Sequence, residues 1–338
     1  MPRLTIKDIA SRAGVSTGAV SYALNGRGRI SEATRARVLA VAEDLGWTPN
    51  NAARGLAGSR SETVGLVLPA GTATTLGVSP FFMEFIGGVE RVLVRHSYGL
   101  LLQVVAEPGT ELTTYRKWQS SRRVDGVMLV DVRVDDPRIA AVQHLQLPAV
   151  VAGPPEVAGG LSCVWTDDAS AVREAVRYLV ALGHRSIARI GGSVELAHSR
   201  IRQAAFDQET RALGVEAHTV PTDFSIEQGT RASRQALLRT PRPTALLYDD
   251  DLNAVAGLGV ARELGLSVPR DVSLLAWDDS LLCQITYPQL SAMSHDVQAY
   301  GDHVARRLFD VLDGAEPAAH LDATPVIRPR ASTGPPPS

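Results

Sequence analysis

The chain has 338 residues, more than one compact core usually holds and enough for two or three. Hydrophobic residues make up 45% and charged residues 21% of the sequence. This globular composition excludes a disordered chain, a collagen-like repeat and a disulfide-rich scaffold. No apolar run reaches the roughly 18–20 residues that a membrane helix needs. The first ten residues, MPRLTIKDIA, lack the apolar stretch of a secretory signal. These features predict a cytoplasmic protein with no membrane partner.

The net charge of −2 conceals an asymmetry along the chain. The first 60 residues hold nine of the 34 Lys and Arg residues but only four of the 36 Asp and Glu residues, so this segment carries +5. The remaining residues carry −7. A small basic head on a large acidic body indicates an anionic partner for the head alone. The two cysteines, Cys163 and Cys283, form no CxxC motif and are expected to be buried free thiols.

Three short helices are predicted within a head of residues 1–47. Thr5 is placed to cap the first helix, which ends at Gly14. Ser16 can cap a second helix that runs to about Asn25. Ser31 can cap a third helix, which ends near residue 46. Residues 48–61 then form a marginal helix or a linker.

The first two helices fit a helix-turn-helix. Small Ala10 allows the helices to approach closely, and Gly14 permits the positive φ of a tight turn. The second helix presents an outward face that would lie in the major groove of DNA, namely Thr17, Gly18, Ser21 and Tyr22. The alternative is a generic pair of helices with surface Ser and Thr residues.

From residue 63 the pattern changes to short β-rich runs that alternate with amphipathic helical segments. The predicted strands are 64–68, 100–105, 126–130, 149–151, 187–190, 245–248 and 272–277. The predicted helices include 81–95, 170–182, 202–213, 226–238, 252–264 and 296–312. Such alternation predicts βαβ units and parallel sheets with helices on both faces.

The expected architecture of this body is two α/β lobes, like those of periplasmic binding proteins. The first lobe is predicted over residues 62–160, with a return segment at about 291–330, and the second over residues 161–290. The Pro-rich end of the chain, residues 331–338, is expected to be disordered.

The segment TIKDIASRAGVSTGAVSYALNGRGRISEATRARVLAVAEDLGWTPNNAARGLAG closely resembles the DNA-binding head of the lactose/galactose-repressor (LacI/GalR) family. The resemblance continues through the body in the order of the family's blocks. These blocks are VDGVMLV, LGHRSIARIGG, TALLYDDDLNAVAGL, VPRDVSLLAWDDS, YPQLSAM and VIRPRAST. The order of head, linker and body makes this a specific match over nearly the whole chain.

The resemblance implies which head residues contact DNA. The positions that read bases are Thr17, Gly18 and Tyr22. The positions that contact phosphates are Thr5, Ser16, Ser21, Asn25, Ser31 and Thr34. Hydroxyl groups and helix N-termini suit phosphate oxygens and fix the register of a protein on the duplex. Gly18 departs from the family pattern because it offers no side chain to a base.

Residues 49–58 resemble the family's hinge helix, which orders on operator DNA. Leu56 occupies the position of a leucine wedge in the minor groove, and the neighbouring contact positions are Asn50, Ala53 and Arg54. Such a wedge unstacks a base step and kinks the duplex. The alternative is a flexible linker with Leu56 docked on the body.

A cleft between the two lobes is the expected ligand site, because ligands of α/β folds bind at the carboxyl ends of the strands. The resemblance places Phe81 and Phe82 over the ring of a ligand, although helix packing would also explain them. Arg202 occupies the position of an arginine that contacts the effector, and its planar donor fork suits vicinal hydroxyls or a carboxylate. A surface salt bridge is the alternative for this arginine.

Two aspartates complete the predicted effector site. Asp250 stands where the family usually has Asn, and Asp278 matches a ligand-binding aspartate. Both could instead cap helices. Helix capping is favoured for Asp168, with a ligand contact as the alternative. Core packing is favoured for Trp165, with stacking on the face of a sugar as the alternative.

Catalytic and metal functions are not expected. The consecutive carboxylates of residues 249–251 lie on a strand-to-helix turn, where three neighbouring side chains cannot all point toward one metal ion. They therefore predict no metal site. The sequence has no GxSxG, HExxH, P-loop or strand-borne GxGxxG motif. His184 lies in a helix-to-strand turn, and capping of helix carbonyls explains it.

The sequence therefore predicts a transcriptional regulator, most simply a repressor, rather than an enzyme. A homodimer would read a roughly palindromic operator in double-stranded DNA, and a small effector, favoured as a sugar, would control its affinity. No further cofactor is expected. A solute-binding protein shares the body but needs an export signal and has no use for a basic head.

Overall fold

The computed structural model describes residues 4–25, 30–47, 60–68, 80–105, 107 and 109–337. The chain divides into two compact units, a head of residues 1–61 and a body of residues 62–338. The predicted hinge positions Asn50, Ala53, Arg54 and Leu56 lie outside the described residues. Among the residues described, no helix is long and apolar enough to cross a lipid bilayer.

The head contains the three predicted helices, α1 (Ile6–Ala13), α2 (Thr17–Asn25) and α3 (Glu32–Asp44). One fully buried aliphatic side chain from each helix meets in a small core, namely Ile9, Val20 and Val38. Gly14 ends α1 with a φ of 64°, the left-handed conformation that its lack of Cβ makes easy.

Side-chain caps fix the starts of all three helices, as predicted. The Asp8 carboxylate accepts a hydrogen bond from the Thr5 N–H at 2.7 Å, as in a capping box. The Ser16 hydroxyl accepts from the Ala19 N–H at 3.1 Å. The third helix begins at Ser31, whose hydroxyl accepts from the N–H of residue 34 at 3.2 Å.

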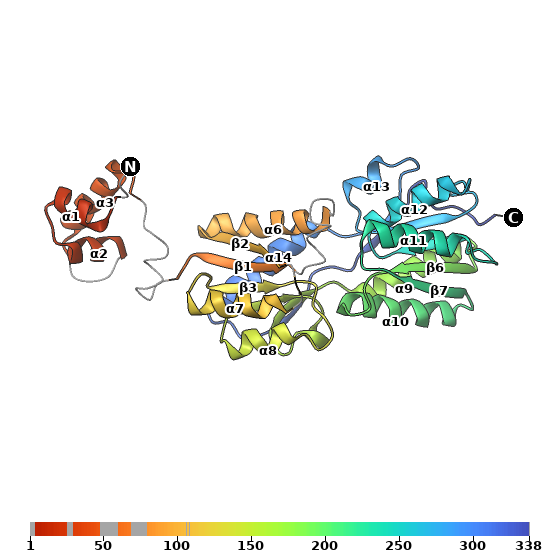
Figure 1. Ribbon diagram of the computed structural model, residues 1–338, viewed down its shortest axis with the longest axis horizontal. Helices are drawn as coiled ribbons and strands as arrows, with labels where there is room; N and C mark the ends of the chain where they lie inside the picture. Colours follow the sequence, from red (N-terminus) through yellow and green to blue (C-terminus); the bar gives the residue numbers. More distant parts are fainter. Residues whose placement is uncertain are drawn as a thin grey trace. The chain divides into compact units, whose positions relative to one another are not determined.

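The body consists of two α/β lobes, each built on a six-stranded sheet (Figure 1). The strand order is β11-β5-β4-β3-β1-β2 in the first sheet and β12-β10-β9-β8-β6-β7 in the second. All pairings are parallel except that of β12 with β10. The strands are β1 (Thr63–Leu68), β2 (Gly99–Val104), β3 (Gly126–Leu129), β4 (Ala149–Ala152), β5 (Ser162–Trp165), β6 (Ser186–Gly191), β7 (Glu216–Pro221), β8 (Ala245–Tyr248), β9 (Ser273–Trp277), β10 (Ser291–Ser294), β11 (Ala319–Leu321) and β12 (Val326–Arg328).

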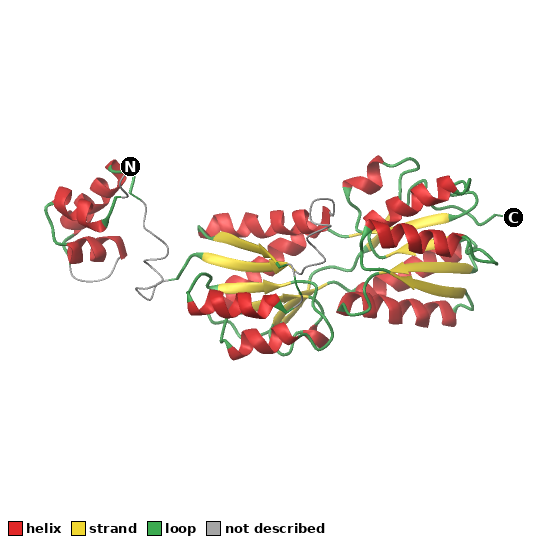
Figure 2. Ribbon diagram, viewed as in Figure 1, coloured by secondary structure: helices red, strands yellow, loops and turns green. Residues whose placement is uncertain are grey.

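Helices cover both faces of each sheet (Figure 2). In the first lobe, α6 (Pro80–His96) and α14 (Val297–Leu312) pack on one face, and α7 (Thr110–Ser120) and α8 (Pro137–His144) on the other. In the second lobe, α11 (Ile226–Leu237) and α12 (Asp251–Glu263) oppose α9 (Asp168–Ala181) and α10 (Ala197–Ala212). The short helix α13 (Leu281–Ile285) and a 3₁₀ turn, Pro155–Val157, complete the body. Both cysteines are buried free thiols, as predicted.

The lobe boundaries differ from the predicted ones. Strand β5 pairs with β4, so the first lobe extends to Trp165 rather than to residue 160. The return segment also divides between the lobes, because α14 and β11 belong to the first lobe whereas β10 and β12 belong to the second. The chain thus crosses between the lobes three times, which favours their behaviour as one unit.

The predicted disorder of residues 331–338 is wrong as far as residue 337. Ser332 is fully buried and donates a hydrogen bond to the Leu274 carbonyl at 2.6 Å. The Ser332 hydroxyl also accepts from the Ser291 N–H at 2.8 Å. The tail is ordered because it supplies hydrogen bonds that neighbouring strands would otherwise lack, and its prolines lower the entropy that ordering costs.

His184 contacts the same tail through its ring. The prediction that this ring caps helix carbonyls is therefore wrong. Its Nδ1 lies 2.8 Å from the Thr244 hydroxyl, and its Nε2 lies 3.0 Å from the Gly334 carbonyl oxygen. Burial lowers the pKa of His184. A neutral imidazole with partners on both nitrogens is a structural link between the second lobe and the tail.

Two glycines allow α6 and α14 to cross closely in the first lobe. A Cβ on Gly88 would lie 1.9 Å from the Gln298 carbonyl oxygen, and one on Gly301 would lie 2.1 Å from the Phe85 carbonyl oxygen. Backbone therefore meets backbone at this crossing.

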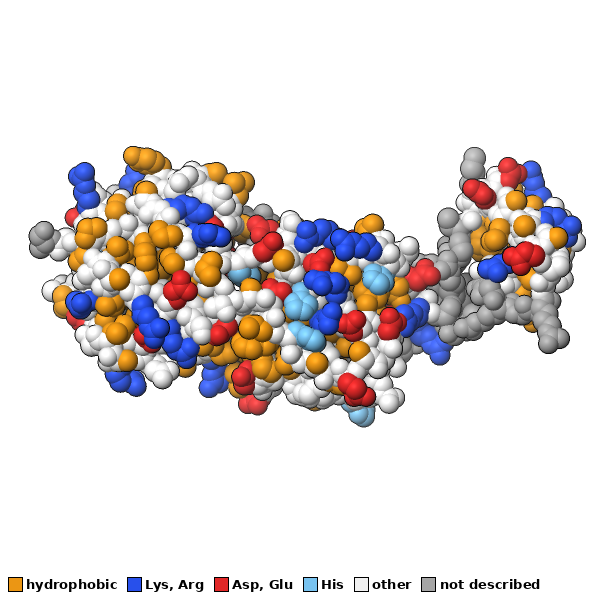
Figure 3. All heavy atoms as spheres, turned by 180° about the vertical axis from the view of Figure 1, so that it is seen from behind, with side chains coloured by type: hydrophobic (Ala, Val, Ile, Leu, Met, Phe, Trp, Pro, Cys, Tyr) orange, Lys and Arg blue, Asp and Glu red, His pale blue; other side chains and the backbone are white. Residues whose placement is uncertain are grey.

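On the body face shown in Figure 3, basic and acidic side chains are interspersed rather than separated into regions of one sign.

The crossing predicts opposite effects for two helical glycines. Gly88→Ala should destabilise the body by about 1–3 kcal/mol, because α6 must move away from α14. Gly259 lies at an exposed site on α12, and no described atom would lie within 4 Å of a Cβ there, so Gly259→Ala should stabilise the body by about 0.5–1 kcal/mol. Urea denaturation followed by tryptophan fluorescence measures both changes. Equal effects of the two substitutions would show that the crossing tolerates a methyl group.

Candidate functional site

A cavity of about 340 Å³ lies between the two lobes. Its lining comes from loops at the carboxyl ends of strands in both sheets and from the first turns of α6 and α10. All five predicted effector residues line it, namely Phe81, Phe82, Arg202, Asp250 and Asp278. The volume is within the range of small-molecule sites in proteins.

Aromatic rings form the apolar part of the lining. Phe81 and Phe82 pack edge to face with their ring centroids 5.5 Å apart, and Phe81 stacks on Phe85 at 6.3 Å. Phe82 is only 8% exposed and belongs to the core of the first lobe, whereas Phe81 is more exposed. Phe81 is therefore the better placed of the two to contact a ligand.

Arg202 is the central charged residue of the site. Its Nη1 donates to the Asp249 carbonyl at 2.9 Å, and its Nε lies 3.3 Å from the Asp168 carboxylate. The guanidinium carbon lies 4.0 Å from the centroid of a Trp277 ring. The predicted alternative of a surface salt bridge is excluded, because Arg202 is only 8% exposed. Stacking and pairing fix the direction of this donor fork.

Helix capping, the favoured interpretation of Asp168, was wrong, whereas the alternative of a ligand-site residue agrees with its place in the cavity lining. Asp167 caps α9 instead, and its carboxylate accepts from the Ser170 N–H at 3.0 Å. Asp168 is therefore free to pair with Arg202 and to accept from the Thr166 hydroxyl at 3.1 Å. The doubled Asp in the sequence was the available signal, since one cap needs one carboxylate.

The three carboxylates of residues 249–251 serve three separate purposes. Asp249 pairs with Arg189, which is 1% exposed. Asp250 caps α12, and both its oxygens accept from Asn253, at 2.7 Å from the backbone and 2.6 Å from the side chain. Asp251 accepts from the Ser280 hydroxyl. Among the described residues no group of three or more His, Cys, Asp or Glu side chains is arranged to hold a metal ion.

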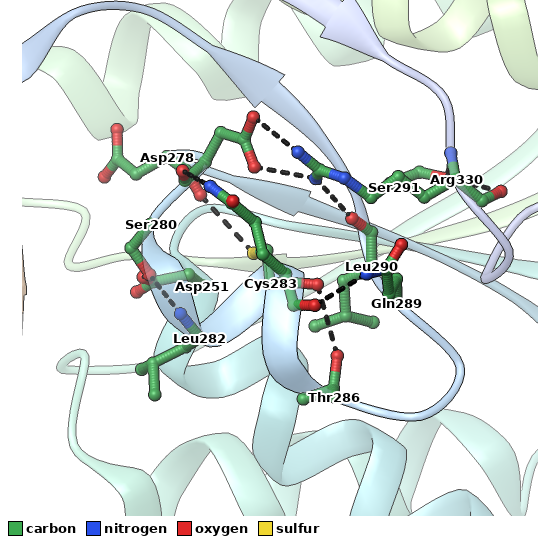
Figure 4. A network of polar contacts seen from close by, with 12 residues as sticks. Asp251, Asp278, Ser280, Leu282, Cys283, Thr286, Gln289, Leu290, Ser291 and Arg330 are labelled. Carbon is green, nitrogen blue, oxygen red and sulfur yellow. Dashed lines mark hydrogen bonds and ion pairs between the residues drawn. The ribbon is translucent and has the colours of Figure 1, made fainter.

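Asp278 begins the loop after β9 and has a φ of 56°, which is unusual for a residue with a side chain. The polar network in Figure 4 holds this loop. The Asp278 carbonyl lies 3.6 Å from the Cys283 sulfur, and Arg330 binds the next carboxylate, that of Asp279, at 2.7 Å. The network anchors the backbone and leaves the Asp278 carboxylate to line the cavity.

Burial shifts the protonation of two aspartates in the lining. It raises the pKa of Asp278 to about 7, although Arg202 opposes the shift. It raises the pKa of Asp250 to about 8, although hydrogen bonds from Asn253 oppose that shift. Hydrogen-bond donors on a ligand would stabilise the ionised form of Asp278.

Further lining residues were not singled out from the sequence. They include Asp131, His198, Phe224 and His295. His198 lies one helical turn before Arg202 on α10, so its spacing was a signal. His295 follows β10, a short strand that the apolar pattern did not reveal.

A backbone bridge joins the two lobes at one side of the cavity. The Ala197 N–H donates to the Val132 carbonyl at 2.9 Å, and the Val134 N–H donates to the Glu195 carbonyl at 3.2 Å. Arg133 and Leu196 form the antiparallel bridge between them. Both segments also line the cavity, so lobe contact and ligand binding involve the same loops.

In the head, α2 exposes the three residues that are predicted to read bases. Thr17, Gly18 and Tyr22 are exposed, and Tyr22 has an exposed fraction of 51%. Among the residues described, a Cβ on Gly18 would meet only the Ser16 hydroxyl, at 3.8 Å. The other predicted contacts are exposed at Thr5, Ser16 and Ser31 and partly buried at Ser21 and Thr34. The side chain of Asn25 is outside the described set.

Comparison with known proteins agrees with this division into head and body. Residues 5–50 match the bacterial regulatory proteins of the lacI family, and residues 176–333 match the periplasmic binding protein-like domain. The chain is 32% identical to the HTH-type transcriptional regulator AglR of Rhizobium meliloti, over 99% of this chain and 95% of that protein. The chain belongs to the lacI family. It is accordingly a DNA-binding transcriptional regulator, and its relatives are regulators rather than enzymes.

Other lacI-family proteins extend the comparison. The chain is 31% identical to the regulator CelR of Thermobifida fusca, over 92% of this chain and 93% of that protein. A solved complex of CelR with cellobiose superposes with a TM-score of 0.75 at 29% identity, covering 98% of this chain and all of that one. A Lac repressor structure, at 24% identity and a TM-score of 0.85 over 98% of this chain and all of that one, has the same fold.

Replacing Asp250 with a neutral residue should show how much the burial of its carboxylate lowers the free energy of unfolding. The pKa is near 3.8 in an unfolded chain and about 8 in the folded protein, so between these values folding takes up a proton and stability falls as pH rises. Asp250→Asn can still cap α12 and carries no charge. It should stabilise the protein by on the order of 1 kcal/mol or more at about pH 8, and much less at about pH 4.

Thermal unfolding across this pH range measures the difference. Glu227→Gln, at an 82% exposed side chain on α11, is the matched loss of one carboxylate. A difference between Asp250→Asn and the parent protein that stays constant with pH would show that Asp250 is ionised in the folded protein.

Proposed function

We propose that this regulator is a repressor whose operator affinity is controlled by a small sugar effector in the cavity between the lobes. The single observation that carries the proposal is that cavity, which combines aromatic rings with a fixed arginine fork and carboxylates in a chain with a DNA-binding head. Aromatic faces and planar hydrogen-bond partners suit the two faces and the hydroxyl edges of a sugar. CelR in complex with cellobiose and the repressors named PurR and CytR support it.

The effector contacts proposed are Phe81, Phe82, Arg202, Asp250 and Asp278, with Asp168 as the carboxylate that orients Arg202. The two oxygens of Asp250 already accept from Asn253, so its contact with a ligand uses remaining lone pairs. No cofactor beyond the effector is proposed, and the cytoplasm is the proposed location.

The proposed DNA contacts follow the exposed face of α2 and the helix starts. Thr17, Gly18 and Tyr22 read bases, while hydroxyls at the helix starts position the head on phosphates. The hinge residues Asn50, Ala53, Arg54 and Leu56 complete the contact set. A free approach at Gly18 allows the α2 backbone to come close to the duplex.

A homodimer on a roughly palindromic operator is the proposed assembly. Exposed large apolar side chains occur on β2 (Leu102, Val104), on α6 (Met83, Val94) and at α13 (Leu281, Ile285), followed by Tyr287, which is 98% exposed. These elements lie along the same edge of the body in Figure 1. Apolar surface of this kind is typical of an obligate interface.

Deletion of residues 1–61 separates the two functions. A duplex that binds the full-length protein is first selected from a random pool, and affinity is measured by fluorescence anisotropy. The truncated protein should lose all operator preference yet keep the thermal stabilisation that an active sugar gives the full chain. Tyr22→Ala in the full chain should weaken operator binding by roughly tenfold or more without lowering thermal stability, since Tyr22 is exposed. Operator binding by the truncated protein would contradict the head assignment.

Leu56→Ala tests the wedge. Operator binding should weaken by roughly tenfold or more, because the kinked base step loses its apolar filler. Sugar-induced stabilisation should be unchanged. Leu238→Ala, at a 63% exposed leucine on the body, is the matched control and should bind operator like the parent. Unchanged operator affinity of Leu56→Ala would favour the flexible-linker alternative.

A further inference from the structure

The cavity lining has more carboxylates than cations. The carboxylates are Asp131, Asp168, Glu195, Asp223, Asp249, Asp250 and Asp278, and the cations of the lining are Arg133 and Arg202. Neither arginine can neutralise the other carboxylates of the lining, because Arg202 pairs with Asp168 and Arg133 lies 4.0 Å from Glu111. Glu111 is itself only 2% exposed, so it needs that partner.

Three of the buried carboxylates in the lining have a protein partner that compensates their charge or offsets the cost of their burial through hydrogen bonds. Asp168 has Arg202, Asp249 has Arg189, and Asp250 accepts two hydrogen bonds from Asn253. Among the described residues, neither the Asp131 carboxylate nor the Asp278 carboxylate has such a partner. The nearby charges of Arg138 and Arg133 act on Asp131, and that of Arg202 acts on Asp278. Asp131 follows β3 in the first lobe and Asp278 follows β9 in the second, so a ligand between the lobes meets one carboxylate from each.

Asp278 lies beside a second unpartnered group. Within the part of the chain that the structure describes, its Oδ1 is buried without a hydrogen bond, and so is the Nδ1 of His295, 3.7 Å away. The His295 side chain is 5% exposed and lines the cavity. A single donor nitrogen to one side of the line that joins these two atoms can lie within hydrogen-bond distance of both.

The histidines of the lining do not supply the missing positive charge. Burial lowers the pKa of His295, and burial together with Arg202 lowers the pKa of His198 to about 3. Both imidazoles are therefore neutral at physiological pH. When the remaining proton of the neutral imidazole is on Nε2, Nδ1 of His295 accepts a hydrogen bond, as the Asp278 oxygen does.

We propose that the effector is an amino sugar, whose protonated amine binds between Asp278 Oδ1 and His295 Nδ1. This inference rests on the proposed sugar-binding function and specifies its ligand class. A primary ammonium has three donors and no acceptor, which matches two neighbouring acceptors better than a hydroxyl group does. Its charge also compensates Asp278 directly, and Asp131 stabilises it from the opposite lobe. Charge-assisted hydrogen bonds are roughly twice as strong as neutral ones.

Matched sugar pairs test the proposal on the full-length protein. D-Glucosamine, D-galactosamine, D-mannosamine and the β-1,4-linked glucosamine disaccharide are each compared with the neutral parent, which for the disaccharide is cellobiose. Isothermal titration calorimetry at neutral pH measures the affinities, and N-acetylglucosamine serves as the uncharged amide control. At least one amino sugar should bind tenfold or more tightly than its parent, and the amide should lose that gain.

Substitutions locate the ammonium. Asp278→Asn keeps the shape of the side chain and should reduce the amino-to-neutral affinity ratio by tenfold or more. Asp131→Asn should reduce it by a smaller factor, and the remote Glu227→Gln should leave it unchanged. If Asp278→Asn fails to fold, the ratios of the parent protein and of Asp131→Asn still decide the question.

The outcomes separate this inference from the proposed function. A neutral sugar that binds as tightly as its amino counterpart, or more tightly, would overturn the amine assignment and leave sugar control intact. Failure of every amino and neutral sugar to bind would count against both. An amino preference that survives Asp278→Asn would overturn the placement of the ammonium.

Discussion

The second lobe depends on burying the guanidinium of Arg202 among carboxylates. This one group ties α10 to the start of α9 through Asp168, to the end of β8 through the Asp249 carbonyl, and to β9 through Trp277. Without it, Asp168 would be a buried and unpaired charge, which costs several kcal/mol. The arrangement fixes the direction of the guanidinium, and its Nε and Nη1 groups already contact protein atoms. The ligand therefore meets a rigid arginine that is already partly neutralised.

The cavity is a property of both lobes together. Three crossings of the chain and the backbone bridge between residues 132–134 and 195–197 connect the lobes beside the lining. A ligand that contacts Asp131 and Asp278 joins the same two lobes. Its binding energy consequently favours the joined arrangement over any alternative. This differential affinity is the physical requirement for an effector that acts on the DNA-binding head.

Much of the fold was predictable because its central strands are continuous apolar runs. The strands at 64–68, 187–190 and 245–248 were predicted nearly to their observed ends. Strands β7, β11 and β12 were missed because they are edge strands, which are half exposed and carry polar residues. Strands β5 and β10 were missed although they are largely buried, because each has only four residues and begins with a serine. The tail was misjudged for a related reason, since its proline content indicates disorder unless other strands supply hydrogen-bond partners for it.

The sequence by itself determined the three capped helices of the head, the alternation that makes two parallel sheets, and the family. These depend on local spacing and on residue types within a few positions. Only the tertiary structure decided which aspartates are compensated. Asp168 and Asp250 both stand at helix starts, but one pairs with an arginine 34 positions away while the other is held by its own helix. Charge compensation depends on distances between segments that are far apart in the chain, and spacing along a sequence does not contain those distances.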